Sequence, residues 1–438
     1  MSGYLSEGDY QAYLKKHENW NFWVNVLDLT FYHTATSFIY GATVLSLYAS
    51  YLTDSAVLIG LIPALQGVMF LLPQMLLARR TQTLPRMKPL LAKISIFERL
   101  PYSIVALSIF LMPNAPKGLA YAILLLSLVV ATGSGGLVGP AWKAMLAKVV
   151  PVSRRGIMFG TSSALGGVLG FGGATVSRHI LATYGYPVSF GISFALCFVF
   201  QAISYLCVIL NREPARAPEA AALSASDYWR RIPGMLRGHP NFVRYLIGNA
   251  LLTFGTMGTA LYIVYARRTF GIGDAMAGNL TMAALLGQSL SAPIMGRLAD
   301  RRGNKWLLQS AGLISGAAIL TVALAPSEIW LYPAFMLVNV AGQATSIAGM
   351  GITMEFSSQD EIPTFTALAG TISGVPMLLA PLLGGSLVDL GGFGLLFGVA
   401  LTLALAGFAM MRLAVKEPRH EGRRASTLPA GAIGGEPG

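Results

Sequence analysis

The chain has 438 residues, of which 54% are hydrophobic and only 11% are charged, and its mean hydropathy is +0.60. Soluble globular domains carry about 25% charged residues, so the composition excludes a soluble domain and indicates a membrane protein with several spans. The net charge of +12 does not indicate a nucleic-acid partner, because the basic residues fall in separate short segments between apolar runs.

The first twenty residues are polar and include acids, unlike a cleaved signal peptide. Within them Tyr10, Tyr13, Leu14 and His17 share one helical face. This pattern predicts a short helix over 1–20 that lies on the inner membrane surface. The first apolar run would then serve as the insertion signal.

Twelve apolar segments follow, each long enough to cross a bilayer as a helix of about 20 residues. They form two groups of six, over 21–211 and 243–415, joined by a hydrophilic segment over 212–242. A polar tail over 416–438 is expected to be disordered. We therefore predict an all-α membrane protein of two six-helix bundles. The predicted spans are 21–50, 55–78, 89–112, 118–141, 157–184, 187–211, 243–266, 275–296, 305–325, 328–350, 363–388 and 394–415.

The hydrophilic segment between the two groups has two parts. The first, over 213–225, is rich in alanine and proline and predicts a flexible linker. The second, over 228–237, mixes aromatic and aliphatic residues with three arginines, a pattern typical of an amphipathic helix at the membrane surface.

Lysine and arginine are distributed unequally between the two predicted sides of the membrane. The N-terminus, alternate loops and the C-terminal tail hold 26 of the 31, all on one side. Basic residues are retained in the cytoplasm, so we expect both termini there, in a multi-pass protein of the plasma (inner) membrane.

The two halves show traces of an internal repeat. Gly-Thr-Ser-Ser at 160–163 has a counterpart in Gly-Thr-Ile-Ser at 370–373, and Pro73 and Pro293 each precede a basic loop. Together with the equal span counts, these matches favour two related halves, the arrangement that alternating access uses.

A charged stretch separates the eighth and ninth predicted spans and reads G-R-L-A-D-R-R-G-N-K from Gly296 to Lys305. Because it lies between two apolar runs, we predict a short charged turn over 296–305 that joins two membrane helices. Gly296 and Gly303 permit a tight turn and a close approach of the flanking helices. Asp300 is the one acid among four basic residues, of which Arg301 is its neighbour. An ordinary cytoplasmic loop would explain the basic residues but not the Gly, Asp and Gly spacing.

This stretch resembles the G-x-L-a-D-R-x-G-r-k signature of the major facilitator superfamily of transporters. The resemblance extends over nearly the whole chain through the twelve spans, the basic central loop and a P-x-x-x-R-G run over 151–156. It implies two pseudo-symmetric bundles that move a small organic solute by alternating access, coupled to ions or protons. It also implies a cytoplasmic lock in which Asp300 meets the start of the fifth span near Gly156, Arg154 or Arg155.

Three departures from the family pattern leave the coupling ion and the direction of transport open. The first-half loop over 76–88 lacks the Asp and the glycine frame, the fourth span lacks the arginine of many proton-coupled members, and the fifth span lacks the Gly-Pro pair that resembles a drug/proton antiporter. The alternatives are a multidrug-type efflux pump and a non-transporting binding, sensor or assembly protein on the same fold.

Polar residues inside apolar spans are the best pointers to a site, because an unpaired charge at the membrane centre is costly. Several of them share one helical face. The resemblance implies that spans one, four, seven and ten line the cavity, so we expect a neutral, hydrogen-bonding site for a polar or amphipathic solute. Hydrogen bonding between helices is the alternative. The candidates are Asn25, Asp28, Tyr32, His33, Thr36, Tyr40, Gln66, Asn249, Thr253, Thr256, Gln288, Asn339, Gln343 and Ser346.

Glu98 and Arg99 in the third span lie at a depth similar to that of Asp28. We hypothesise that Arg99 pairs with Asp28 or Glu98 in a charge relay or conformational latch; a purely structural ion pair explains the sequence equally well. Histidine has an ordinary pKa near neutral pH, so His33 is a candidate proton carrier, although a lone histidine in a helix is more often a hydrogen-bonding residue. The gating and relay candidates are Glu98, Arg99, Arg155, Gly296, Asp300, Arg301 and Gly303.

No catalytic or nucleotide-binding motif accompanies these spans: H-E-x-x-H, G-x-S-x-G and G-x-x-x-x-G-K-[ST] are all missing. Cys197 and Cys207 would lie about 15 Å apart on a straight helix, too far for a disulfide, and no Cys/His cluster has metal-site spacing. We predict no enzyme activity, no cofactor and no metal. The expected partners of a monomeric chain are a small-molecule substrate, the lipid bilayer and protons as coupling ion, with no nucleic acid.

Overall fold

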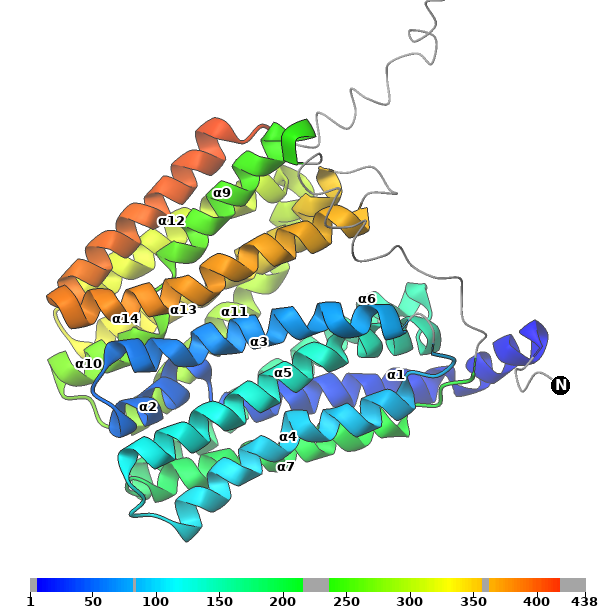
Figure 1. Ribbon diagram of the computed structural model, residues 1–438, viewed down its shortest axis with the longest axis horizontal. Coiled ribbons are helices and arrows are strands. Elements are labelled where there is room, and N and C mark those ends of the chain that lie inside the picture. Colours follow the sequence, from blue (N-terminus) through cyan, green and yellow to red (C-terminus); the bar gives the residue numbers. More distant parts are fainter. Residues whose placement is uncertain (1–5, 82–83, 216–235, 357–361, 418–438) are drawn as a thin grey trace, which may run out of the picture.

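The computed structural model describes residues 6–81, 84–215, 236–356 and 362–417, and these residues are almost entirely helical (Figure 1). The α-helices are α1 (Glu7–Phe38), α2 (Ser46–Leu52), α3 (Ala56–Thr81), α4 (Lys88–Leu111), α5 (Lys117–Val149), α6 (Val152–Thr183), α7 (Val188–Leu210), α9 (Pro240–Gly255), α10 (Tyr262–Phe270), α11 (Ala275–Arg302), α12 (Asn304–Ala323), α13 (Leu331–Glu355) and α14 (Ile362–Ala409). Four short helical segments join them: η1 (Gly41–Leu45), η2 (Thr259–Leu261), η3 (Glu328–Trp330) and η4 (Met410–Ala414).

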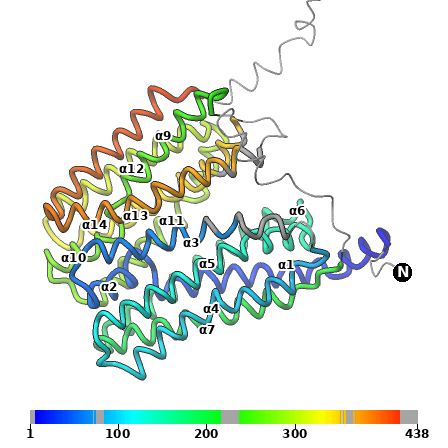
Figure 2. Tube along the Cα trace, viewed as in Figure 1, coloured from blue at the N-terminus to red at the C-terminus, as the bar shows by residue number. Residues whose placement is uncertain are grey.

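These helices make twelve crossings in two bundles, six in each half of the sequence (Figure 2). The first crossing is interrupted at η1, so that α1 and α2 together form it, and α9 and α10 likewise share the seventh. The last helix, α14, makes two crossings because Gly392 turns the chain with φ +75° and ψ −177°, a backbone conformation that only glycine adopts readily. The all-helical fold predicted from the sequence is confirmed.

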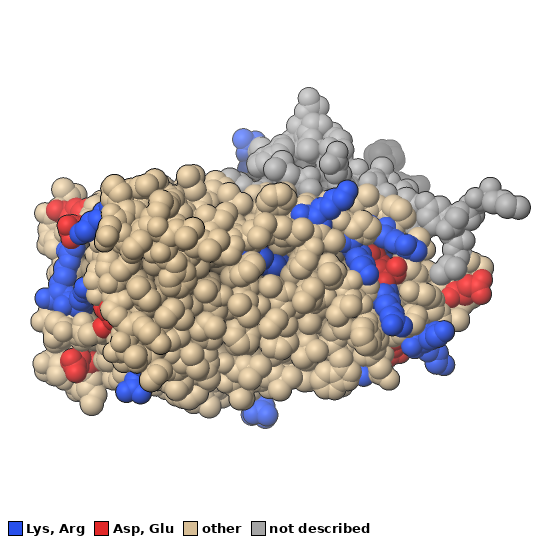
Figure 3. All heavy atoms as spheres, turned by 90° about the horizontal axis from the view of Figure 1, so that it is seen from below, with Lys and Arg blue, Asp and Glu red and all other residues tan. Residues whose placement is uncertain are grey.

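The side of the molecule is apolar in a broad band. Among the described residues, eight helical segments are long and apolar enough to cross a membrane, and Leu368–Ala414 has the length of two crossings. Charged side chains on the face in Figure 3 gather mostly at its two ends. Large hydrophobic side chains such as Phe97, Leu126 and Leu290 are exposed in between. The chain is therefore a multi-pass membrane protein whose band contacts lipid.

The N-terminal helix and the last described residues lie at the same end of the molecule, which we call the termini end; the opposite end is the far end (Figure 1). The space around glycines shows where the two bundles are in contact along α3 and α14. A Cβ on Gly385 would press on the backbone of Ala56, whereas one on Gly374, about three turns nearer the termini end, would lie 3.6 Å from Leu71. A Cβ on Gly370 would meet nothing within 4 Å. The two helices therefore diverge toward the termini end.

The second seam, between α6 and α11, opens in the same direction. A Cβ on Gly278 would lie 2.6 Å from the backbone of Arg178, so the helices touch near the far end. At the other end of the same helices, Gly156, Gly160 and Gly296 each have nothing within 4 Å of the Cβ position. The bundles thus form a V that is closed at the far end and open at the termini end.

Each bundle is closed by a matching pair of hydrogen bonds between its first helix and a residue just after its last helix. Asn21 accepts from the Arg212 amide at 2.8 Å and donates to the Arg212 carbonyl at 3.1 Å. Asn241 bonds Lys416 in the same way, at 2.8 and 3.2 Å. We call these pairs the two clasps. They place the two halves of the sequence in equivalent structural positions, which supports the predicted repeat.

The N-terminus differs from the prediction. Helix α1 is continuous from Glu7, with Ser6 as its N-cap, and no break separates residues 7–20 from the first crossing. The sequence explains this continuity, because neither glycine nor proline occurs between Gly8 and Gly41. The location of 1–20 on the membrane surface stays a prediction.

The start of the predicted flexible linker is also different. Glu213 is 6% exposed, and its carboxylate accepts from the amides of Met87 and Lys88 at 2.8–2.9 Å, which caps the start of α4. Lys148 lies 3.4 Å from the same carboxylate. Residues 213–215 are therefore anchored. The rest of the linker, most of the predicted surface helix over 228–237, and the tail from 418 lie outside the described residues.

Candidate functional site

A cavity of about 650 Å³ lies between the two bundles. Its wall comes from α3, α9, α11, α12, α13 and α14 and from the break in the first crossing, where Tyr40, Gly41 and Ala42 interrupt the helix. All of the residues that line it are uncharged. The cavity therefore presents only neutral groups to a ligand.

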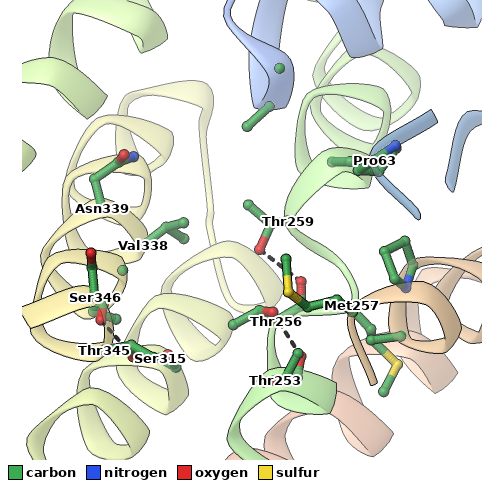
Figure 4. Close-up of a pocket in the computed structure, with 18 of the residues that line it drawn as sticks. Pro63, Thr253, Thr256, Met257, Thr259, Ser315, Val338, Asn339, Thr345 and Ser346 are labelled. Carbon is green, nitrogen blue, oxygen red and sulfur yellow. Dashed lines mark hydrogen bonds between the residues drawn. The ribbon is translucent and has the colours of Figure 1, made fainter. Parts of the chain in front are cut away.

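The polar part of the wall consists of hydroxyl and carboxamide side chains. Figure 4 shows Thr253, Thr256 and Thr259 on one side and Asn339 and Ser346 on the other. Eight of the candidates from the sequence line the cavity, and Thr259, Ser315 and Thr345 join them without having been expected. The eight are Tyr40, Gln66, Thr253, Thr256, Gln288, Asn339, Gln343 and Ser346.

The threonines of the seventh crossing present hydrogen-bond acceptors to the cavity. Thr253 donates to the carbonyl of Asn249 at 2.9 Å, Thr256 to that of Thr253 at 2.7 Å, and Thr259 to that of Thr256 at 2.9 Å. Since each hydroxyl hydrogen is used in this way, the oxygen lone pairs remain to accept from a ligand. Carboxamides such as Gln343 supply both donors and acceptors.

Hydrogen bonds between the bundles close the cavity toward the far end. Tyr40 donates to Asn339 Oδ1 at 2.5 Å, and the hydroxyls of Thr43 and Thr281 lie 2.5 Å apart. Farther out, the Tyr51 hydroxyl bonds both oxygens of Asp274 at 2.8 Å. We call this set of contacts the far gate.

The signature stretch at the termini end is mostly helical. Helix α11 continues through Asp300 and Arg301 to Arg302, and Gly303 alone turns the chain, with φ +92°. The prediction of a charged turn over 296–305 is thus wrong in its extent. The reason is that Gly303 can adopt a conformation closed to other residues, so one residue suffices to redirect the chain into α12.

The residues expected to meet Asp300 are bonded within their own bundle. Arg154 pairs with Glu18 at 2.8 Å, and Arg155 donates to the carbonyls of Val150 and Ala147 at 3.0 and 2.7 Å. With the termini end open, these arginines hold the start of α6 to α1 and α5. The expected lock between Asp300 and α6 stays a prediction for a conformation closed at this end.

Known proteins resemble this chain in sequence and in fold. A family model described as Major Facilitator Superfamily matches residues 245–434. The fold resembles that of a D-xylose-proton symporter, with a TM-score of 0.68 at 16% identity over 92% of this chain and 99% of the other. It also resembles a nucleoside transporter NupG (D323A mutant), with a TM-score of 0.66 at 14% identity over 89% of this chain and 99% of the other. The second half of the chain, over residues 245–434, thus matches the major facilitator superfamily.

Relatives of similar sequence have diverse names. The chain is 27% identical to Multidrug resistance protein MdtG of Dickeya zeae over 62% of its own length and 66% of that protein. It is 29% identical to Solute carrier family 67 member A1 of Homo sapiens over 41% of its own length and 42% of that protein. These alignments thus span less than two thirds of each relative.

Several candidates lie away from the described cavity. Asn25 is fully buried and bonds Asn211 at 2.6 Å, which favours the alternative of helix–helix hydrogen bonding. Asn249 donates to Ser373 at 3.2 Å. His33 lies against Gly166 of α6, and Thr36, three residues later, donates to the His33 carbonyl. A shared helical face does not distinguish the cavity from the bundle interior, so the sequence could not separate these residues from the others.

Asp28 lies inside the first bundle, 4% exposed, and is bound by neutral donors. Ser204 of α7 donates to Oδ1 at 2.6 Å and Trp142 of α5 to Oδ2 at 3.1 Å. Both partners come from helices distant in sequence, which is why neither was expected. Tyr32, one turn along α1, completes this polar face.

Arg99 pairs with its neighbour Glu98, at 2.7 Å. Its remaining donors bond the carbonyls of Gln201 and Ser95 at 3.0 and 3.1 Å and the Ser204 hydroxyl at 3.2 Å. Of the two pairings left open, the structure therefore shows Arg99 with Glu98. We call Asp28, Glu98, Arg99 and Ser204 the buried charge cluster.

Proposed function

We propose that this chain is a secondary transporter that carries a small, uncharged polar or amphipathic organic solute by alternating access. The observation that supports it most is the cavity of about 650 Å³ between two bundles, lined by hydroxyl and carboxamide groups and by no charged side chain. A cavity of this size suits a small organic molecule.

The neutrality of the wall favours an uncharged ligand. A charged group loses its hydration when it enters a pocket of low dielectric constant, and only an opposite charge or several strong hydrogen bonds compensate for this loss. Here the polar groups are neutral, while Met257, Met377 and Val338 provide apolar surface. Methionine adapts to ligands of different shape, so an amphipathic solute fits this wall well.

The V shape supports alternating access. The bundles touch at the far gate and separate at the termini end, so solute reaches the cavity from the termini end in this conformation. We infer from the excess of lysine and arginine that this end is cytoplasmic and that the membrane is the plasma (inner) membrane. The conformation is then inward-facing.

The buried charge cluster supports proton coupling. It contains two carboxylates and one guanidinium, so with both acids ionised it carries a net negative charge inside the membrane, and one proton removes that charge. Asp28 is the better proton acceptor, because Glu98 already pairs with Arg99. The other titratable groups around the cluster are Tyr32 on α1, Tyr102 on α4, and Cys197, Tyr205 and Cys207 on α7, while α5 contributes Trp142.

The solute assignment is tested by a stability screen. Purified protein is melted with libraries of uncharged and charged solutes at two pH values, since a ligand of the folded state raises the apparent melting temperature. Uncharged polar or amphipathic solutes are expected to raise it, and Thr256→Val with Gln343→Leu is expected to weaken the effect about tenfold in concentration by removing two polar groups of the wall. A response restricted to charged solutes would contradict the proposal.

Flux separates transport from binding. Solutes found in the screen are then tested for uptake and efflux in proteoliposomes with and without a pH gradient. Binding without flux would favour the alternative of a sensor or assembly protein.

The multidrug-type efflux pump is a second candidate, favoured by the 27% identity to Multidrug resistance protein MdtG. It predicts that many unrelated amphipathic compounds raise the melting temperature. A single chemical series would instead favour a dedicated solute transporter.

A further inference from the structure

The signature stretch at the end of α11 has a second copy at the end of α14. Residues 296–303 read G-R-L-A-D-R-R-G and residues 385–392 read G-S-L-V-D-L-G-G, so both follow G-x-L-x-D-x-x-G. The backbone repeats as well: Gly303 has φ +92° and ψ 159°, and Gly392 has φ +75° and ψ −177°. Both glycines redirect the chain from one crossing into the next.

The two copies lie at opposite ends of the molecule. The copy in α11 ends the eighth crossing at the termini end, and the copy in α14 ends the eleventh crossing at the far end. This placement is expected for inverted repeats within one six-helix half, where each element recurs with opposite orientation across the membrane.

The far-end copy joins the two bundles. Asp389 Oδ1 accepts from the amide of Ala56 at 3.0 Å, and Oδ2 lies 3.4 Å from the amide of Val57 and 3.1 Å from the hydroxyl of Ser55. A carboxylate of the second bundle thus caps the first turn of α3, in the first bundle.

The first glycine of the copy makes this cap possible. A Cβ on Gly385 would lie 2.5 Å from backbone atoms of Ala56 and Val57. The missing side chain lets the start of α3 approach α14, and Asp389, one turn later, then reaches its amides. Glycine and aspartate therefore act together in a single contact.

The copy at the termini end is positioned relative to α6 as the far-end copy is positioned relative to α3. Helix α6 packs against α11 near the far end, where Gly278 meets Arg178, just as α3 packs against α14. In this conformation nothing lies within 4 Å of a Cβ on Gly296, and the same holds for Gly156 in the first turns of α6. Closing the termini end would bring Gly296 and Asp300 to the start of α6 as Gly385 and Asp389 now meet the start of α3.

We propose that Asp389 is a latch that holds the far end closed by capping α3, and that it alternates with the lock between Asp300 and α6 that the family resemblance implies for a closed termini end. In each conformation one of the two contacts is formed and the other is broken. The two contacts therefore oppose each other in the equilibrium between the conformations. This inference rests on the alternating access in the proposed function and adds the pair of residues that sets its balance.

The test measures from which side of the membrane the cavity is reached, in the full-length chain in vesicles of known orientation. The reporter is Gly41→Cys, because Gly41 lines the cavity and nothing lies within 4 Å of its Cβ position. The two native cysteines are buried and are replaced by alanine in all samples. Labelling by a membrane-impermeant maleimide is compared from the far end and from the termini end.

Asp389→Asn keeps one acceptor oxygen but removes the negative charge at the start of α3, so labelling from the far end is expected to rise about two- to fivefold. Asp300→Asn is expected to lower it, because the opposite conformation loses its latch. The matched control is Asp54→Asn, which removes an exposed carboxylate next to the cap at the same end and should leave labelling unchanged.

The proposal is overturned if Asp389→Asn labels no more than Asp54→Asn, or if Asp389→Asn and Asp300→Asn shift labelling in the same direction. Should Asp389→Asn not fold, Gly385→Ala decides, because its Cβ must push the start of α3 away. Its control is Gly398→Ala, because nothing lies within 4 Å of that Cβ position. If Gly385→Ala is labelled from the far end no more than Gly398→Ala, the proposal is also overturned. Labelling needs no solute, so a wrong solute assignment leaves this result unaffected.

Discussion

The Ser204 hydroxyl links the charged side chains of Arg99 and Asp28 through two hydrogen bonds. It accepts from Arg99 at 3.2 Å and donates to Asp28 at 2.6 Å. A hydroxyl can rotate, so the bridge accommodates an ionised Asp28 as acceptor and a protonated Asp28 that donates back to Ser204. This reversibility suits a group that gains and loses a proton, whereas a structural ion pair keeps one charge state.

Asp28→Asn separates these two roles. Asparagine keeps the shape and an acceptor for Ser204 but carries no dissociable proton. If Asp28 is the proton site, net transport driven by a pH gradient should fall about a hundredfold or more, while exchange of solute at equal pH on both sides continues. The measurement is flux in proteoliposomes with and without the gradient.

The control for this variant is Glu18→Gln, an acid of the same bundle whose pair with Arg154 is about one-third exposed and therefore weak. It should leave both fluxes near those of the unmodified chain. An Asp28→Asn protein that melts at a lower temperature but still responds to the gradient would identify the cluster as structural.

At the scale of helices, the seam between α3 and α14 depends on glycine. A Cβ on Gly60 would overlap the carbonyl of Pro381, so the two backbones touch at this point of the closed end. Such backbone approach is typical of helix contacts in membranes, where packing rather than the hydrophobic effect holds helices together.

Gly60→Ala should therefore destabilise the conformation described here. Overpacking of this kind costs about 1–3 kcal/mol, more than alanine gains in helix propensity. The measurement is the apparent melting temperature in detergent, which should fall. Gly139→Ala in α5, where nothing lies within 4 Å of the Cβ, is the control and should leave the temperature unchanged or raise it. Equal shifts for both would show that the contact with Pro381 does not matter.

The helices themselves could be predicted well, because apolar length and basic loops are local properties of the sequence. The face of the seventh and tenth crossings that lines the cavity also follows from helical spacing, as Thr253 and Gln343 show. The partners of Asp28 could not be predicted, since Ser204 and Trp142 come from distant helices. The second copy of the signature was visible in the sequence, but its lack of basic residues concealed it.

For the molecule as a whole, the sequence indicated two related halves, while their relative position required the structure. In alternating access, the same sequence adopts one conformation that is open at the termini end and another that is open at the far end. No sequence pattern therefore specifies one of these conformations alone. Contacts between bundles, such as that of Asp389 with α3, are the features that identify the conformation described here.

The two clasps have a consequence for how the protein is assembled. Because Asn21 ties the first helix of one bundle to Arg212, and Asn241 does the same with Lys416 in the other, each half seals its own circle of helices. Such halves should mature as independent units. Two polypeptides, 1–215 and 236–438, produced together in one cell are expected to reassemble, as their joint purification through a tag on one of them would demonstrate.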